Sequence, residues 1–265
     1  MSIKRHTISI ILYGLRFSPL PYDEKLKRLR DIGYRSIQGD IPHEMTNEDH
    51  KKLIDRLGFE FSCVAGDLED IETNPEKYIE GCHMFDCDEV MIACMPTELR
   101  MSYDGYMEFI DRVNKVGSML SREGIFIGYH NHAQEFRRFP NGRMGMDLLF
   151  NGFNFQAVHF ILDTHWVQAG GGDILWWLER CKGNIKYLHC KDYRIAPANY
   201  KTVCGKAEKQ FSQIGEGNLP WRLIIDKAQD AGVKAFIVEQ DYTYNEDPYD
   251  CAATSYATLK SYGLS

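Results

Sequence analysis

The chain has 265 residues and is 44% hydrophobic, so it can bury one large core and has a size typical of an α/β barrel. The formal net charge is -7, and no dense run of lysine and arginine occurs, which argues against a nucleic-acid-binding protein and favours a small neutral or polar substrate. We expect one domain, covering residues 1–265.

The cysteines and the start of the chain bear on its compartment. The eight cysteines form no CxxC pair, and several lie in apolar runs where a thiol behaves as a small hydrophobic side chain, so we expect reduced thiols. The sequence has no apolar run of about 18 residues, and its start lacks the apolar centre and cleavage site of a signal peptide. These features predict a soluble, cytoplasmic protein.

Short apolar runs alternate with helical patterns along the whole chain. From Asp23, apolar residues follow helical spacing and stop at Gly33, a residue that favours the end of a helix. The other expected helices span about 47–57, 78–85, 103–123, 146–150, 173–181, 219–231 and 249–262. The expected strands are residues 8–15, 34–38, 59–64, 89–94, 125–130, 158–163, 185–190 and 234–239.

Eight strand–helix units with short connections predict parallel strands and right-handed crossovers, and therefore an α/β fold of the (β/α)8 TIM barrel type. The alternative is an open doubly wound sheet, but no glycine-rich nucleotide-binding fingerprint follows the first strand. Residues 194–218 form the longest piece without clear periodicity. A long loop at this position of a barrel is typical of a functional lid.

Potential metal ligands stand at the ends of the predicted strands five to eight. They are His130, Asp163, His189 and Glu239. The carboxyl ends of barrel strands meet at one rim, and imidazole with carboxylate suits a divalent ion such as Mn²⁺, Co²⁺, Zn²⁺ or Mg²⁺. Each residue alone would more often be a core residue or a helix cap. Four in register predict a metal site.

Several motifs of the sequence match a pattern known from other proteins. They are GYHNH at 128–132 with Glu-Phe at 135–136, LDTHWVQAGG at 162–171, LHCKD at 188–192, IGEGN at 214–218 and VEQD at 238–241. Together they resemble the sugar phosphate isomerase/epimerase family of xylose isomerase-like TIM barrels, over about residues 8–264. The resemblance implies a divalent-metal enzyme that acts on a sugar, a keto-sugar or an inositol-type polyol.

The resemblance also implies a ligand set. In relatives such as the ketose epimerases, the ligands are Glu, Asp, His and Glu from strands five to eight, and Asp163, His189 and Glu239 match the last three. The first position differs. Either His130 replaces the glutamate, or Glu135 supplies a carboxylate from the following loop, and we favour His130.

The expected reaction is isomerisation or epimerisation through a metal-stabilised enediolate. A further group must move the proton, and Glu135 is the first choice, because burial raises the pKa of a carboxylate. An exposed glutamate paired with Arg137 or Arg138 is an equal alternative. His132, Lys191 and Asp192 are the other candidates for acid and base, with Lys191 either stabilising negative charge or simply paired with Asp192 or Glu216.

Six residues are expected to contact the substrate. They are Tyr13, Arg16, Tyr129, Trp166, Asp192 and Glu216. Tyr129 and Trp166 would form a flat wall for a sugar ring, although aromatic residues are as often part of the core. Asp192 equally fits a helix or loop cap, and the glycines beside Glu216 equally fit a plain turn.

Two other functions fit the same sequence. A lyase, either a dehydratase of an inosose or an enzyme that cleaves a 3-keto-glycoside by elimination, would use the same site. A non-catalytic sugar-binding barrel is the other alternative. The acidic charge and the absence of extra histidines argue against a DNA-repair nuclease. We therefore expect a sugar or polyol ligand without nucleic-acid or membrane partners, and a homodimer is compatible with such barrels.

Overall fold

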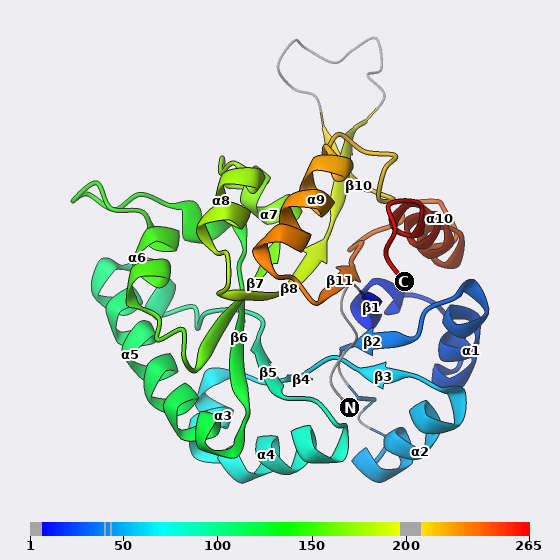
Figure 1. Ribbon diagram of the computed structural model, residues 1–265, viewed down its shortest axis with the longest axis horizontal. Helices are drawn as coiled ribbons and strands as arrows, with labels where there is room; N and C mark the ends of the chain where they lie inside the picture. Colours follow the sequence, from blue (N-terminus) through cyan, green and yellow to red (C-terminus); the bar gives the residue numbers. More distant parts are fainter. Residues whose placement is uncertain (1–6, 40, 43, 197–207) are drawn as a thin grey trace.

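The computed structural model describes residues 7–39, 41–42, 44–196 and 208–265. Nine parallel strands form a nearly closed ring with helices around it, in the order β3-β2-β1-β11-β8-β7-β6-β5-β4 (Figure 1). The terminal strands of this order, β3 (Glu60–Phe61) and β4 (Val64–Ala65), are adjacent in sequence and are the two halves of the predicted third strand. The predicted TIM barrel is therefore confirmed, and the open-sheet alternative is wrong.

The other barrel strands lie close to their predicted positions, because buried apolar runs give a clear signal for parallel strands. They are β1 (Thr7–Ile11), β2 (Ser36–Gln38), β5 (Glu89–Ile92), β6 (Phe126–His130), β7 (Val158–Asp163), β8 (Ile185–Cys190) and β11 (Ala235–Val238). The first strand is shorter than predicted, since Leu12–Leu15 forms the 3-10 helix η1. The apolar run extends beyond the end of β1 because η1 also contributes a core residue, the buried Leu15.

The helices surround the barrel. They are α1 (Tyr22–Ile32), α2 (Asn47–Leu57), α3 (Leu68–Thr73), α4 (Pro75–Met84), α5 (Tyr103–Leu120), α6 (Gly145–Gly152), α7 (Thr164–Ala169), α8 (Ile174–Arg180), α9 (Trp221–Ala231) and α10 (Pro248–Ser261), with 3-10 turns at η2 (Leu99–Met101), η3 (Ser121–Glu123) and η4 (Ala133–Phe136). The sequence did not predict α3 and α7, which have six residues each. So short a helix shows too few turns for its apolar periodicity to be visible.

A hairpin follows β8. Its strands, β9 (Asp192–Ile195) and β10 (Lys209–Ser212), pair antiparallel, and β10 stands at the top of Figure 1. The sequence predicted no strands here. Residues 197–207, and with them Cys204, lie outside the described residues, so the lid function of this segment stays a prediction. The cysteines within the described part are free thiols, as expected for reduced cysteines. None of the helices described is both long and apolar enough to cross a membrane.

The interior of the barrel is packed. A buried apolar cluster there consists of Ile11, Cys63, Met91, Ile161, Tyr187, Ala235 and Ile237. Tyr187 of β8 reaches across the barrel and donates a hydrogen bond to the carbonyl oxygen of Ser62, at 3.0 Å. Because side chains fill the interior, a substrate can be bound only where the strands end, which in this fold is the carboxyl-terminal rim.

Candidate metal centre and active site

Four neighbouring strands bring the predicted metal ligands together. His130 and Asp163 are the last residues of β6 and β7, His189 lies near the end of β8, and Glu239 follows β11 directly. One potential ligand atom from each residue lies within 4.8 Å of the other three, and all four residues are buried. Asp163 and His189 are paired residues in the register of adjacent strands, which explains why they meet.

Two buried atoms without a hydrogen-bond partner fit a role as metal ligands. His130 Nδ1 lies 3.3 Å from the carbonyl oxygen of Ala93. In the tautomer that donates an N–H from Nδ1 to this oxygen, Nε2 keeps its lone pair, and this is the form of histidine that binds a metal. His130 Nε2 and Asp163 Oδ2 are buried without a hydrogen-bond partner and lie 3.5 Å apart. Such buried polar atoms are costly unless something pairs with them. A divalent cation would pair with both.

The remaining two ligands are in direct contact. His189 Nδ1 lies 2.6 Å from Glu239 Oε2. Burial would raise the pKa of Glu239, but Lys191 and the two histidines hold it well below its usual range, so the carboxylate is ionised. Burial and the nearby His130 lower the pKa of His189, which favours the neutral, metal-binding imidazole. Two imidazoles with two carboxylates fit Mn²⁺, Co²⁺ or Zn²⁺ better than the oxygen-preferring Mg²⁺.

Hydrogen bonds between the strands fix the ligands in place. Asn131 Oδ1 accepts the backbone N–H of Asp163 at 3.0 Å, and Asp163 Oδ1 accepts the N–H of Trp166 at 2.8 Å, which caps α7. The hydroxyl of Thr164 bonds to both the backbone oxygen and the N–H of Lys191, at 2.9 and 3.0 Å. Asp163 is therefore held by the residue that follows β6 and by the cap of α7, and Lys191 is tied to the start of α7.

Lys191 adds a buried cation to the site. Its Nζ lies 3.0 Å from Glu239 Oε1, 3.4 Å from Asp163 Oδ2 and 3.2 Å from Asp241, rather than beside Asp192 or Glu216. Burial would lower the pKa of Lys191, but these carboxylates raise it, so the ammonium is charged. Lys191 therefore offsets part of the negative charge of the site.

Asp241 is a site residue to which the sequence assigned no role. Its position in the VEQD motif was a usable signal, because in extended backbone it shares a face with Glu239. Its carboxylate contacts Lys191 and lines the cavity above the metal ligands. Burial raises the pKa of Asp241 to about 6, with Lys191 opposing the shift.

A cavity of about 850 Å³ opens above the ligand set. Three of the expected substrate-binding residues, Tyr13, Arg16 and Trp166, line it, as does His132. The Arg16 guanidinium lies 3.8 Å from the centre of the Tyr13 ring. Burial and the neighbouring His130 lower the pKa of His132 to about 3, so its imidazole is neutral near pH 7. This cavity is where a small molecule would meet the ligand set.

Glu135 and Tyr129 do not line the cavity. Glu135 is fully buried, accepts the Tyr129 hydroxyl at 2.7 Å through Oε1, and accepts the backbone N–H of His132 at 2.8 Å through Oε2. Both carboxylate oxygens therefore accept hydrogen bonds, and these bonds connect η4 to β6 and to the residue before η4. The structure thus places Glu135 outside the cavity lining and outside the ligand set, and it places Tyr129 in the core.

Asp192 and Glu216 are also outside the cavity. Asp192 is buried and accepts backbone N–H groups of Gly215, Gly217 and Leu219 together with the indole N–H of Trp221. It therefore holds the turn at residues 214–218, which is the cap role considered as its alternative. Glu216 is exposed on that turn. Neither residue contributes to the site that the strands form.

This placement gives a test at Glu135. The carboxylate accepts hydrogen bonds from the Tyr129 hydroxyl, the His132 N–H and the Gln134 side-chain amide. Replacement by glutamine puts an NH₂ group against at least one of these donors, so we expect Glu135→Gln to lower the free energy of unfolding by about 1–3 kcal/mol and to change turnover less than about tenfold. Denaturant unfolding and steady-state kinetics measure the two effects. Tyr129→Phe is the matched control, because it removes one of the same hydrogen bonds from the opposite side. A stable variant without turnover would restore Glu135 as a base.

The fold and the site together define a TIM barrel with a metal-capable centre at the carboxyl-terminal rim. A family model described as xylose isomerase-like TIM barrel matches residues 26–261. The chain therefore belongs to the xylose isomerase-like TIM barrel family.

Relatives of known structure share the fold at low sequence identity. A sugar phosphate isomerase/epimerase from Parabacteroides distasonis superimposes with a TM-score of 0.78 at 20% identity, covering 98% of this chain and 95% of that chain. A Bacillus anthracis protein, titled "probable 3-DHS dehydratase", has a TM-score of 0.72 at 12% identity, covering 96% of this chain and 98% of that one. Among curated proteins, an inosose dehydratase of Salmonella agona is 23% identical over 143 residues, which are 50% of this chain and 45% of the relative. The match thus spans less than half of that protein.

Proposed function

We propose that this protein is a divalent-metal-dependent isomerase or epimerase that acts on a sugar or keto-sugar by removing a proton from the carbon next to a carbonyl. The supporting observation is the set of four buried donors within 4.8 Å of one another, at the floor of a cavity of about 850 Å³. Three of their atoms, His130 Nε2, Asp163 Oδ2 and His189 Nε2, are buried without a hydrogen-bond partner. Such atoms are costly for a fold, so a role as ligands explains why they are there.

The ligands would be His130, Asp163, His189 and Glu239. The metal, when bound, supplies a Lewis acid that makes the carbon beside a ketone more acidic. The chain supplies the rest of the chemistry. The ammonium of Lys191 stands beside two of the ligand carboxylates and stabilises negative charge that develops on the substrate oxygen.

Proton transfer needs cavity-lining groups outside the ligand set. Asp241 and His132 meet this condition, since both line the cavity and neither belongs to the four ligands. We assign proton removal to the carboxylate of Asp241 and a hydrogen bond to the substrate oxygen to the neutral imidazole of His132. Trp166, Tyr13 and Arg16 form the wall against which the sugar lies.

A second candidate reaction is elimination, as in a dehydratase of an inosose or the cleavage of a 3-keto-glycoside. The match over 143 residues to an inosose dehydratase favours it. The first step would be the same proton removal. The electron pair of the former C–H bond then forms a carbon–carbon double bond, and the group on the next carbon leaves with the electrons of its own bond and takes up a proton. The site as built serves both reactions, so the fate of the substrate distinguishes them.

Incubation in D₂O with Mn²⁺ and a panel of ketoses, inososes and 3-keto-glycosides tests the proposal. An isomerase or epimerase returns product of the same size that carries deuterium at carbon, whereas a lyase gives an unsaturated or shortened product. Mass spectrometry and NMR separate these outcomes. A non-catalytic sugar-binding barrel would incorporate no deuterium and would still bind sugar after chelator treatment, which would contradict the proposal.

A further inference from the structure

An exposed group of aromatic side chains lies at the mouth of the barrel. We call Phe17, Phe211, Tyr242 and Tyr244 the aromatic rim. Phe17 is 70% exposed and Tyr242 51%, and their rings stack at 5.9 Å with 23° between the planes. Tyr242 also stacks on Phe211 at 6.3 Å. Large apolar side chains gathered at one exposed place mark a binding surface more often than scattered ones do.

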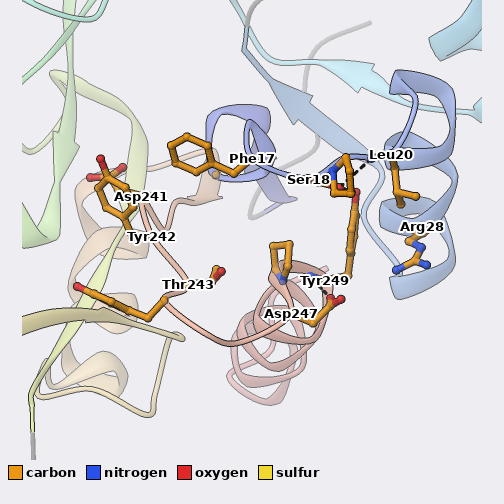
Figure 2. Close-up of a pocket in the computed structure, with 13 residues that line it drawn as sticks. Phe17, Ser18, Leu20, Arg28, Asp241, Tyr242, Thr243, Asp247 and Tyr249 are labelled. Carbon is orange, nitrogen blue, oxygen red and sulfur yellow. Dashed lines mark hydrogen bonds between the residues drawn. The ribbon is translucent and has the colours of Figure 1, made fainter.

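The aromatic rim begins where the metal cavity ends. A second cavity, of about 450 Å³, is lined by Phe17, Tyr242, Tyr244 and Asp241, and Asp241 also lines the cavity above the metal ligands. Figure 2 shows Asp241 and Tyr242 together on one side of this second cavity, with Phe17 above them. The two cavities therefore meet at Asp241.

The rim is held in position and carries polar groups at its edges. The Arg16 guanidinium lies 4.3 Å from the centre of the Phe17 ring and 5.0 Å from that of Tyr242. The hydroxyl of Tyr244 accepts the backbone N–H of Phe211 at 3.1 Å. Flat apolar faces surrounded by a guanidinium, a carboxylate and hydroxyls match a sugar ring, which has apolar C–H faces and hydroxyls at its edge.

We propose that the aromatic rim is a second subsite, which binds the second sugar ring of a disaccharide whose first ring occupies the metal cavity. The identity of the first ring rests on the proposed function. The geometry supports the assignment, because the metal cavity, about 850 Å³, and the second cavity, about 450 Å³, both have Asp241 in their lining, so a ligand longer than one ring can extend from the first into the second. A single six-membered ring would leave the rim and much of the metal cavity to water.

Sugar binding by the metal-loaded protein tests the subsite. Glucose is titrated against cellobiose, maltose and lactose by calorimetry. We expect at least one disaccharide to bind about tenfold more tightly than glucose, as one added stacking contact implies. Phe17→Ala and Tyr242→Ala should each reduce the ratio of disaccharide affinity to glucose affinity to about one. Leu223→Ala is the matched control, because Leu223 is 55% exposed on α9, away from both cavities, and should keep the preference.

Each result supports or overturns the subsite. Equal binding of all four sugars, or a preference unchanged in both rim variants, overturns it. A dimer that dissociates on Phe17→Ala in sedimentation experiments also overturns it, because the rim would then bind a second copy of the chain. The subsite and the proposed function fail in different experiments. A protein that takes up no metal and turns over no ketose, yet binds a disaccharide more tightly than glucose, would refute the proposed function and support the subsite. Turnover of ketoses without any disaccharide preference refutes the subsite alone.

Discussion

Asp163→Asn is expected to lose bound metal and turnover together while the barrel stays folded. The amide still accepts the N–H of Trp166, so the cap of α7 is kept, but the side chain no longer offers a negatively charged oxygen to a cation. We expect less than about a tenth of the wild-type metal content and a loss of about a thousandfold in kcat/KM. Elemental analysis of the purified protein and kinetics on the ketose panel measure both.

Asp173→Asn is the matched control for that substitution. Asp173 caps α8 in the same way, through the N–H of Trp176 at 3.0 Å, but lies away from the ligand set. It should leave the metal content and kcat/KM at wild-type values and so separates the capping effect from ligation. Full metal content in Asp163→Asn would show that Asp163 is not a ligand.

Lys191→Met is expected to destabilise the metal-free protein strongly. The ammonium lies among the carboxylates of Asp163, Glu239 and Asp241, and its removal leaves their buried negative charge with less compensation. Loss of one partner of a buried ion pair costs about 3–5 kcal/mol, and we expect a loss of that order in the presence of chelator. Added Mn²⁺ should restore more stability to the variant than to the wild type, because a second cation then supplies the missing charge.

Thermal unfolding with chelator and with Mn²⁺ measures both effects. Lys227→Met is the control, since Lys227 forms a surface ion pair with Glu179 and such pairs contribute about 0–1 kcal/mol. If Lys191→Met were as stable as the wild type without metal, the proposed charge balance of the site would be wrong. If Mn²⁺ stabilised both proteins equally, the metal and Lys191 would not share the same carboxylates.

The convergence of the four proposed ligands could be predicted from the sequence because each stands at the end of a strong strand signal. In parallel strands the side-chain direction alternates with a period of two, and the carboxyl ends of neighbouring strands meet at one rim. His130, Asp163 and His189 lie within their strands and Glu239 follows its strand directly, so strand assignment alone was enough to place them together.

Loop residues could not be placed in this way. Glu135 follows β6 closely, but the 3-10 turn η4 directs its carboxylate back to Tyr129 and the N–H of His132. Asp192 begins the hairpin after β8, and its carboxylate receives the N–H groups of a turn that lies more than twenty residues further along the chain. The regular alternation of side-chain directions along a strand does not continue into such loops. The directions of their side chains therefore depend on contacts that the local sequence does not encode.

The sequence by itself determined the alternation of strands and helices, the barrel, and the ring of donors, because these follow from local apolar patterns and the shared direction of parallel strands. The tertiary structure decided which charged groups meet the donors. Lys191 turns to Asp241, in the loop after β11, instead of to its neighbour Asp192, since burial makes an ammonium stable only where several carboxylates surround it. The aromatic rim was decided in the same way, by rings from segments far apart in the chain that stack only after the barrel closes.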